Sequence, residues 1–238
     1  MVGVSPNCVV VDPRAPDREL LRRAAALLKA GGLVAFPTEP VYGLGAHALD
    51  AAAVKKVFIA KDRPTWDPLI VHVKSLAMAV GLARRVPPLF DRLTTAFWPG
   101  PLTLIVEKSG RVPAEVTAGR PTVAMRLPRH PVAAALLHEA QLPIAAPSAN
   151  RFGRPSPTCA AHVVADLGDR VDLILDAGPT PLGVESTILD LTVSPPAIRR
   201  PGGVSREEIE TLIGPVVVWS SVTEAPVTSS RPAPGMST

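Results

Sequence analysis

The sequence of 238 residues has little of what marks metal-bound, disulfide-bonded or membrane-spanning proteins. Its two cysteines, Cys8 and Cys159, form no CxxC pair or Cys/His cluster, which argues against structural zinc and favours reduced thiols. No uncharged apolar run approaches the roughly 20 residues that span a bilayer, and the N-terminus lacks the basic and apolar segments of a secretory signal. These absences predict a cytoplasmic protein without a membrane partner.

Aromatic residues and blocks of like charge are also scarce. Aromatic residues make up 4% of the chain, which leaves few side chains on which single-stranded bases could stack. The net charge of +4 comes mainly from arginine, and the arginine runs stop at pairs such as Arg199-Arg200. We therefore expect no basic tail or arm. So small a surplus of positive charge suits an anionic small ligand as well as a polyanion.

Several catalytic motifs are missing. The sequence has no GxxxxGK[ST], GxSxG or HExxH, and its five histidines form no ligand set, so no metal site is predicted. Residues 43–48 fit GxGxxA, but a dinucleotide site needs those glycines directly after a strand. Here the preceding predicted strand ends near Phe36 and six residues intervene, which argues against a nicotinamide site.

The composition is that of a folded globular protein. Hydrophobic residues make up 47% and charged residues 19% of the chain. Proline is abundant, with 28 residues, and we expect the prolines to shape loops within a folded domain. The last stretch, residues 220–238, is rich in Pro, Ser and Thr without periodicity, and is interpreted as a linker or tail after a domain at 1–219.

Short β-type runs alternate with helical patterns, which predicts an α/β fold. Because the stretch 98–127 has strands with no helix between them, a mixed sheet is expected rather than a purely parallel one. Asp17 and Asp50 are predicted N-caps, and Ser205 with Glu208 forms a capping box. The strands are expected at 8–11, 33–36, 69–73, 102–107, 122–127, 144–146, 173–175 and 186–191.

Two cations, Lys61 and Arg63, follow the helix that begins after Asp50. They could be a solvated basic helix end, which the helix dipole favours. Alternatively, Pro64 holds them on a rigid loop just before a strand, where they could bind phosphate. The sequence leaves both interpretations open.

Polar residues occur at the ends of several predicted strands. Ser148 and Asn150 follow a strand of small residues, although Pro, Ser and Asn also favour ordinary turns. His72 stands in an otherwise apolar strand, where a histidine is more often part of the core than a ligand. Arg126 ends one strand and Ser186 begins another. Because ligands usually bind at strand ends of open α/β sheets, the shared position favours a site more than any single motif does.

Seven segments in order resemble the YrdC-like family of threonylcarbamoyl-AMP synthases. The resemblance runs from about residue 31 to residue 203. It implies a single YrdC-like domain with a twisted mixed sheet flanked by helices around a deep, positively lined cleft. The matching segments are 31–45, 58–64 with 68–72, 97–103, 123–131, 146–153, 185–190 and 200–202.

Similar proteins join L-threonine, bicarbonate and ATP to form threonylcarbamoyl-AMP and pyrophosphate, with Mg²⁺ bridging the phosphates. A separate transferase complex then moves the threonylcarbamoyl group to an adenosine of certain tRNAs. The resemblance implies a catalytic set of Lys61, Arg63, Ser148 and Asn150. It places Arg63, Asp67, Thr122, Ser148, Ser156 and Arg200 at ATP-binding positions, and Pro40, His72, Arg126, Ala146 and Ser186 on the threonine side, where Ala146 could contribute only its backbone.

Two departures from the family pattern stand out. Pro40 replaces a threonine that usually lies near the bound amino acid, and proline has neither a hydroxyl nor an N–H. The chain also stops shortly after Pro234-Gly-Met236, a segment found in the linker of longer relatives. It resembles a long-form synthase cut within its linker, and that linker is expected to help close the cleft.

Two alternatives remain beside the synthase. One is carbamoyl-adenylate chemistry on another acceptor, as in related domains of much longer carbamoyltransferases. The other is an RNA-binding module that uses the basic cleft without ATP turnover, with weak binding of RNA or tRNA that depends steeply on salt.

Overall fold

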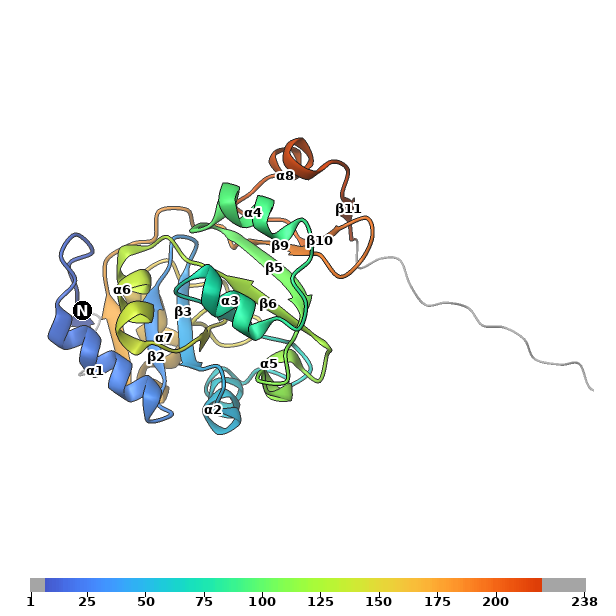
Figure 1. Ribbon diagram of the computed structural model, residues 1–238. Coiled ribbons are helices and arrows are strands. Elements are labelled where there is room, and N and C mark those ends of the chain that lie inside the picture. Colours follow the sequence, from blue (N-terminus) through green and yellow to red (C-terminus); the bar gives the residue numbers. More distant parts are fainter. Residues whose placement is uncertain (1–6, 220–238) are drawn as a thin grey trace, which may run out of the picture.

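The computed structural model describes residues 7–219, and the predicted tail at 220–238 lies outside the described residues. In the described part, eleven strands form one mixed sheet in the order β1-β8-β2-β3-β7-β4-β6-β5-β9-β10-β11 (Figure 1). Parallel and antiparallel pairs both occur, as predicted. The strands are β1 Cys8–Val10, β2 Val34–Pro37, β3 Tyr42–His47, β4 Ile70–His72, β5 Leu102–Glu107, β6 Thr122–Arg126, β7 Ile144–Ala145, β8 Leu173–Asp176, β9 Thr187–Asp190, β10 Ala197–Arg200 and β11 Val217–Val218.

Helices α1, α2 and α8 begin where the capping signals of the sequence predict. Asp17 and Asp50 accept hydrogen bonds from the first N–H groups of α1 and α2, and the Ser205 capping box forms at α8. None of the helices in the described part is long and apolar enough to cross a membrane. The helices are α1 Arg18–Lys29, α2 Ala51–Lys61, α3 Leu76–Leu82, α4 Phe90–Phe97, α5 Ala114–Thr117, α6 Pro131–Ala140, α7 Ala160–Leu167 and α8 Arg206–Ile213, with a 3₁₀ turn, η1, at Gly168–Arg170.

The glycine-containing strand β3, Tyr42–His47, is not among the strands predicted from the sequence. Strand β3 pairs antiparallel with β2 on one side and with β7 on the other. A Cβ on Gly45 would lie 2.8 Å from side-chain atoms of both Phe36 and Ile144, so glycine is required where these strands pack. The expectation of no helix within 98–127 is also wrong, because the single-turn α5 lies there.

Side chains of the central strands are buried on both faces of the sheet. Val34 and Phe36 of β2 pack with α1 and α6, whereas Ala35 between them packs in the larger apolar cluster with α2 and α7. This alternation follows from the two-residue period of a strand. Figure 1 shows α1 and α6 side by side on one face of the sheet with α7 behind it. The helices thus pack on both faces of the sheet, and several strands end in polar residues.

Candidate functional site

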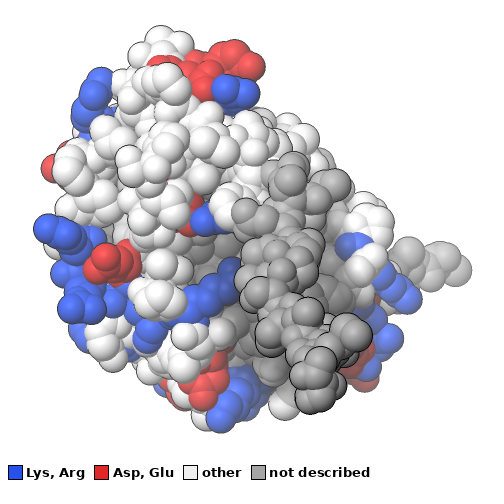
Figure 2. Space-filling view, turned by 90° about the vertical axis from the view of Figure 1, so that its right-hand side faces the viewer, with Lys and Arg blue, Asp and Glu red and all other residues white. Residues whose placement is uncertain are grey.

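One cavity of about 800 Å³ collects all the residues that the sequence named as candidate site residues. They come from the turn before β3, the end of α2, strands β4 and β6, the loop after β7, and the start of β9 and end of β10. Figure 2 shows Lys and Arg side chains reaching into the visible part of this hollow. The residues are Pro40, Lys61, Arg63, Asp67, His72, Thr122, Arg126, Ala146, Ser148, Asn150, Ser156, Ser186 and Arg200.

Lys61, the last residue of α2, is not a solvated helix end. Its side chain is 1% exposed, and its ammonium donates hydrogen bonds to the backbone carbonyls of Ser148, at 2.5 Å, and Asn150. Burial, with a further contribution from the charge of Arg63, lowers the pKa of Lys61 to about 7. Lys61 therefore joins the two motifs that the sequence separates by 87 positions.

Arg63 is fixed by the loop that follows α2. Asp62 takes the left-handed conformation and ends the helix, which turns the chain toward the cavity. The Arg63 guanidinium forms an ion pair of 2.8 Å with Asp67 and donates to the carbonyls of Asp67 and Pro68. It also lies over the Phe152 ring, 5.9 Å from the centroid. The guanidinium is thus held in one orientation at the cavity wall.

The loop at Ser148 and Asn150 lies against β3. Ser148 bridges to Gly43, and the N–H of Ala149 donates to the carbonyl of Tyr42. The amide nitrogen of Asn150 donates to the carbonyls of Arg151 and Arg154, while its buried side-chain oxygen has no hydrogen-bond partner among the described residues. This is more than an ordinary turn, because an unpaired buried acceptor in a cavity wall is costly unless a ligand supplies a donor.

His72 and Arg126 are register partners on the parallel strands β4 and β6. His72 is 3% exposed and stacks edge-on against Phe36, but neither ring nitrogen has a partner in the described part of the chain. Burial and the charge of Arg126 lower the pKa of His72 well below its usual value, so the ring is neutral at pH 7. His72 is therefore a buried histidine whose neutral ring, with one donor and one acceptor, is not satisfied by the described part of the chain, and it lines the cavity.

Arg126 is held from two sides. Its Nε donates to the carbonyl of Gly100 at 3.1 Å, and its Nη2 forms an ion pair of 2.7 Å with Glu39. The other Glu39 oxygen accepts from the backbone N–H groups of Arg129 and His130. Among the described residues, Nη1 of Arg126 has no hydrogen-bond or ion-pair partner, which leaves that group available to an anion in the cavity.

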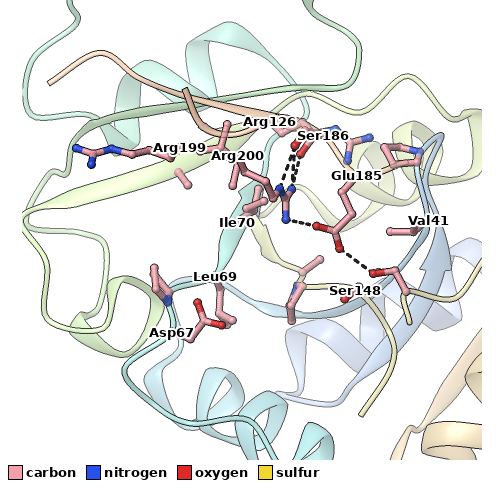
Figure 3. Close-up of a pocket in the computed structure, with 18 of the residues that line it drawn as sticks. Val41, Asp67, Leu69, Ile70, Arg126, Ser148, Glu185, Ser186, Arg199 and Arg200 are labelled. Carbon is pink, nitrogen blue, oxygen red and sulfur yellow. Dashed lines mark hydrogen bonds and ion pairs between the residues drawn. The ribbon is translucent and has the colours of Figure 1, made fainter. Parts of the chain in front are cut away.

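Arg200 and Ser186 lie next to each other in the cavity wall. Arg200 donates to the Ser186 carbonyl from both Nε and Nη2, and forms an ion pair with Glu185 (Figure 3). The Ser186 hydroxyl lies 2.8 Å from that of the fully buried Thr103 on β5. Ser186 is thereby fixed by a neighbouring strand, and Arg200 is fixed by Ser186.

Sequence reasoning missed several residues of the site. Glu39 and Glu185 lie within the matching segments. The residues next to each glutamate in the sequence do not indicate which distant arginine it pairs with. Seven cations line the cavity beside three carboxylates, and each carboxylate is paired with an arginine. The cavity-lining charged residues not named from the sequence are Arg120, Arg154, Glu185, Asp190 and Arg199.

Comparison with known proteins identifies the family. A family model named Sua5_yciO_yrdC and described as telomere recombination matches residues 26–202. The chain belongs to the Sua5/YciO/YrdC family. The resemblance drawn from the seven sequence segments is thus confirmed, and so is the mixed α/β fold with helices flanking a central sheet.

Two Sua5/YciO/YrdC relatives are named threonylcarbamoyl-AMP synthase. The one from Pyrococcus abyssi is 49% identical over 216 residues, covering 91% of this chain and 63% of the relative. The one from Bacillus subtilis is 47% identical over 231 residues, covering 95% of this chain and 65% of the relative. The crystal structure of P. abyssi Sua5 complexed with L-threonine matches with a TM-score of 0.88 at 48% identity, covering 89% of this chain and 62% of that one. The chain thus spans just under two-thirds of the length of these relatives.

Proposed function

We propose that the protein is an L-threonylcarbamoyladenylate synthase, a nucleotidyltransferase that joins L-threonine, bicarbonate and ATP and releases pyrophosphate. The observation that carries this proposal is the convergence of Lys61, Arg63, Ser148 and Asn150 with His72 and Arg126 in one cavity. The names of the relatives and the threonine-bound Sua5 structure support the same substrate set. We expect the reaction in the cytoplasm.

The proposed chemistry uses charge and position rather than a covalent nucleophile. The threonine amine attacks the bicarbonate carbon, and water leaves with an amine proton, which gives a carbamate. A carbamate oxygen then attacks the α-phosphate of ATP. Negative charge builds up on the phosphate oxygens in this step, and pyrophosphate leaves as the bond between the α- and β-phosphates breaks. Arg63 and Arg200 are fixed cations that would stabilise that charge, and Lys61 would do so in its protonated form. Holding three reactants in one cavity removes much of the entropic barrier.

The amino-acid side of the site would be formed by Arg126 and His72. The accessible Nη1 of Arg126 suits the threonine carboxylate, because guanidinium and carboxylate form strong charge-assisted hydrogen bonds. The neutral His72 ring can donate to or accept from the amine, the hydroxyl or the carbamate. Ser186 and the backbone of Ala146 line the same part of the cavity.

Pro40 offers this substrate only an apolar ring. Its carbonyl already accepts a hydrogen bond of 3.1 Å from the Thr180 hydroxyl. The nearby Thr38 hydroxyl donates to the Val41 carbonyl at 2.6 Å, so it does not replace the missing threonine as a free donor. We therefore assign Pro40 a packing role beside the bound amino acid.

The nucleotide side would be formed by Arg63, Asp67, Thr122, Ser148, Ser156 and Arg200. Mg²⁺ would enter with ATP. In the described part of the chain no cluster of three or more His, Cys, Asp or Glu side chains could hold a metal ion. The cavity carboxylates are paired with arginines, so phosphate oxygens and water fit as the main ligands of Mg²⁺.

A reaction that consumes the product must follow. Threonylcarbamoyl-AMP is an activated mixed anhydride, and we expect a transferase complex to pass its threonylcarbamoyl group to an adenosine of tRNA. The alternative of an RNA-binding module without ATP turnover finds no support in the comparisons.

The test is pyrophosphate release from ATP by the purified chain, with L-threonine and bicarbonate each present or omitted. Release that requires both substrates is expected, and threonylcarbamoyl-AMP should form in equal amount. Arg126→Lys should raise the KM for threonine more than that for ATP, because only the planar fork matches a carboxylate. Pyrophosphate release without threonine would favour another acceptor. The absence of both pyrophosphate release and ATP binding would overturn the proposal.

A further inference from the structure

A carboxylate occupies the part of the cavity assigned to the nucleotide. One oxygen of Glu185 accepts a hydrogen bond of 2.7 Å from the Ser156 hydroxyl, and the other forms an ion pair with Arg200. Figure 3 shows Glu185 and Arg200 facing each other across this part of the cavity. Ser156 and Arg200 are both residues that we assign to ATP. The two donors are therefore already engaged by the protein itself.

The negative charge of Glu185 acts on three cations of the same site. It raises the pKa of Lys61, Arg63 and Arg200, against the lowering by burial. The Glu185 side chain is 33% exposed, so its carboxylate belongs to the cavity wall and not to the core. Glu185 thus supplies an anion among the cations proposed to bind phosphate.

The backbone of Glu185 is held in place. Its carbonyl accepts a hydrogen bond of 2.9 Å from the N–H of Gly203. A Cβ on Gly202 would lie 2.2 Å from the same carbonyl oxygen, so the glycine allows a backbone contact that no other residue would permit. Any change in the contacts of the carboxylate must therefore come from rotation of the side chain between its staggered rotamers.

Carboxylate and phosphate oxygens compete for the same partners. Both are acceptors, and hydroxyl and guanidinium donors serve either. Two negative groups in one site disfavour each other, so the carboxylate cannot keep its contacts while a phosphate takes them. A polyphosphate carries several charges and can displace a single carboxylate, whereas a weakly charged anion has less to gain.

We propose that Glu185 is an internal anion that occupies part of the phosphate site in the ligand-free protein and rotates away when a polyphosphate binds. Glu185 lowers the affinity of the site for all anions. Only anions of high charge then bind strongly enough to displace it. This inference rests on the proposed function, because it assumes that Ser156 and Arg200 hold nucleotide phosphates.

The test compares binding of inorganic pyrophosphate and of ATP, both without Mg²⁺, by calorimetry. Glu185→Gln and Glu185→Ala remove the charge and should bind pyrophosphate about tenfold more tightly than the unaltered chain. Glu185→Asp keeps the charge and should stay within about threefold. Glu139→Gln is the matched control: it removes the same charge from the surface ion pair between α1 and α6, and should change nothing.

The outcomes separate the two levels of inference. If the unaltered chain binds both ligands and neither neutral variant binds more tightly, Glu185 organises Ser156 and Arg200 rather than competing for them, and the inference is wrong. If the unaltered chain binds neither ligand, the proposed function fails and the inference with it. Thermal unfolding of each variant shows that a change in affinity is not a loss of folded protein.

Discussion

The Arg126 guanidinium lies 2.7 Å from the Glu39 carboxylate, and both side chains are less than one-tenth exposed. Glu39 belongs to the turn between β2 and β3, whereas Arg126 ends β6. Burial lowers the pKa of Arg126, and the charge of Glu39 opposes that lowering. Glu39 also ties this turn to the loop before β9, since its carbonyl accepts the N–H of Leu182 at 3.1 Å. One buried carboxylate thus compensates the cation that we assign to the threonine carboxylate.

Removing the charge of Glu39 should destabilise the fold. Glu39→Gln leaves Arg126 buried without a counter-charge, and removing one partner of a buried pair costs about 3–5 kcal/mol. Urea denaturation should show this loss as a lower midpoint with an unchanged slope. The exposed Arg22–Glu139 pair is the control, and Glu139→Gln should cost less than about 1 kcal/mol. Equal midpoints for Glu39→Gln and Glu139→Gln would contradict the assignment of Glu39 as the buried counter-charge of Arg126.

Lys61 should take up a proton when ATP binds. Its pKa of about 7 leaves the amine mostly neutral at pH 8, and a polyphosphate nearby raises that pKa because it favours the charged form. Calorimetry at pH 8 in two buffers with different ionisation enthalpies should show up to about one proton taken up. Lys61→Met keeps an unbranched side chain but cannot be protonated. Its proton uptake on ATP binding should be smaller than that of the unaltered chain by the proton assigned to Lys61. Equal uptake by both proteins would rule out Lys61 as its source.

His72 should contribute to ligand binding at a cost in stability. Its two ring nitrogens are buried without partners, so His72→Phe should stabilise the ligand-free protein by about 1 kcal/mol. The same change should weaken threonine binding at least about tenfold, because a hydrogen-bonding group is lost from the cavity. Urea denaturation and threonine calorimetry on the same samples measure both effects. If His72→Phe binds threonine as tightly as the unaltered chain, His72 is a core residue without a role in binding.

Stability should fall as the pH drops below about 6.5. Burial lowers the pKa of His47, His72 and His130 in the folded protein. Below the unfolded value of about 6.5, the unfolded chain binds protons that the folded chain does not, so acid favours unfolding. Urea denaturation at pH 7.5 and pH 5 should show this decrease, and His72→Phe should make it smaller. The same decrease with and without His72 would contradict its burial as a neutral ring.

Local signals were enough for most of the secondary structure. Asp17, Asp50 and Ser205 cap helices as predicted, because a cap depends on residues only two or three positions apart. Strand β3 was missed because glycine has a low propensity for strands. Its conformation depends on pairing with β2 and β7, the latter about a hundred residues away in the chain. The candidate site residues were named largely from motif resemblance, and the structure brings all of these candidates together in one cavity.

The sequence by itself determined the alternation of strands and helices, the family and the set of polar residues at strand ends. Only the tertiary structure decided that Lys61 is buried on the carbonyls of the Ser148–Asn150 loop, that His72 lacks partners and that Glu39 and Glu185 hold Arg126 and Arg200. The physical reason is that charge pairing, burial and the pKa of a group depend on distances in space between segments far apart in the chain. The propensities and spacings that a sequence displays act over a few residues.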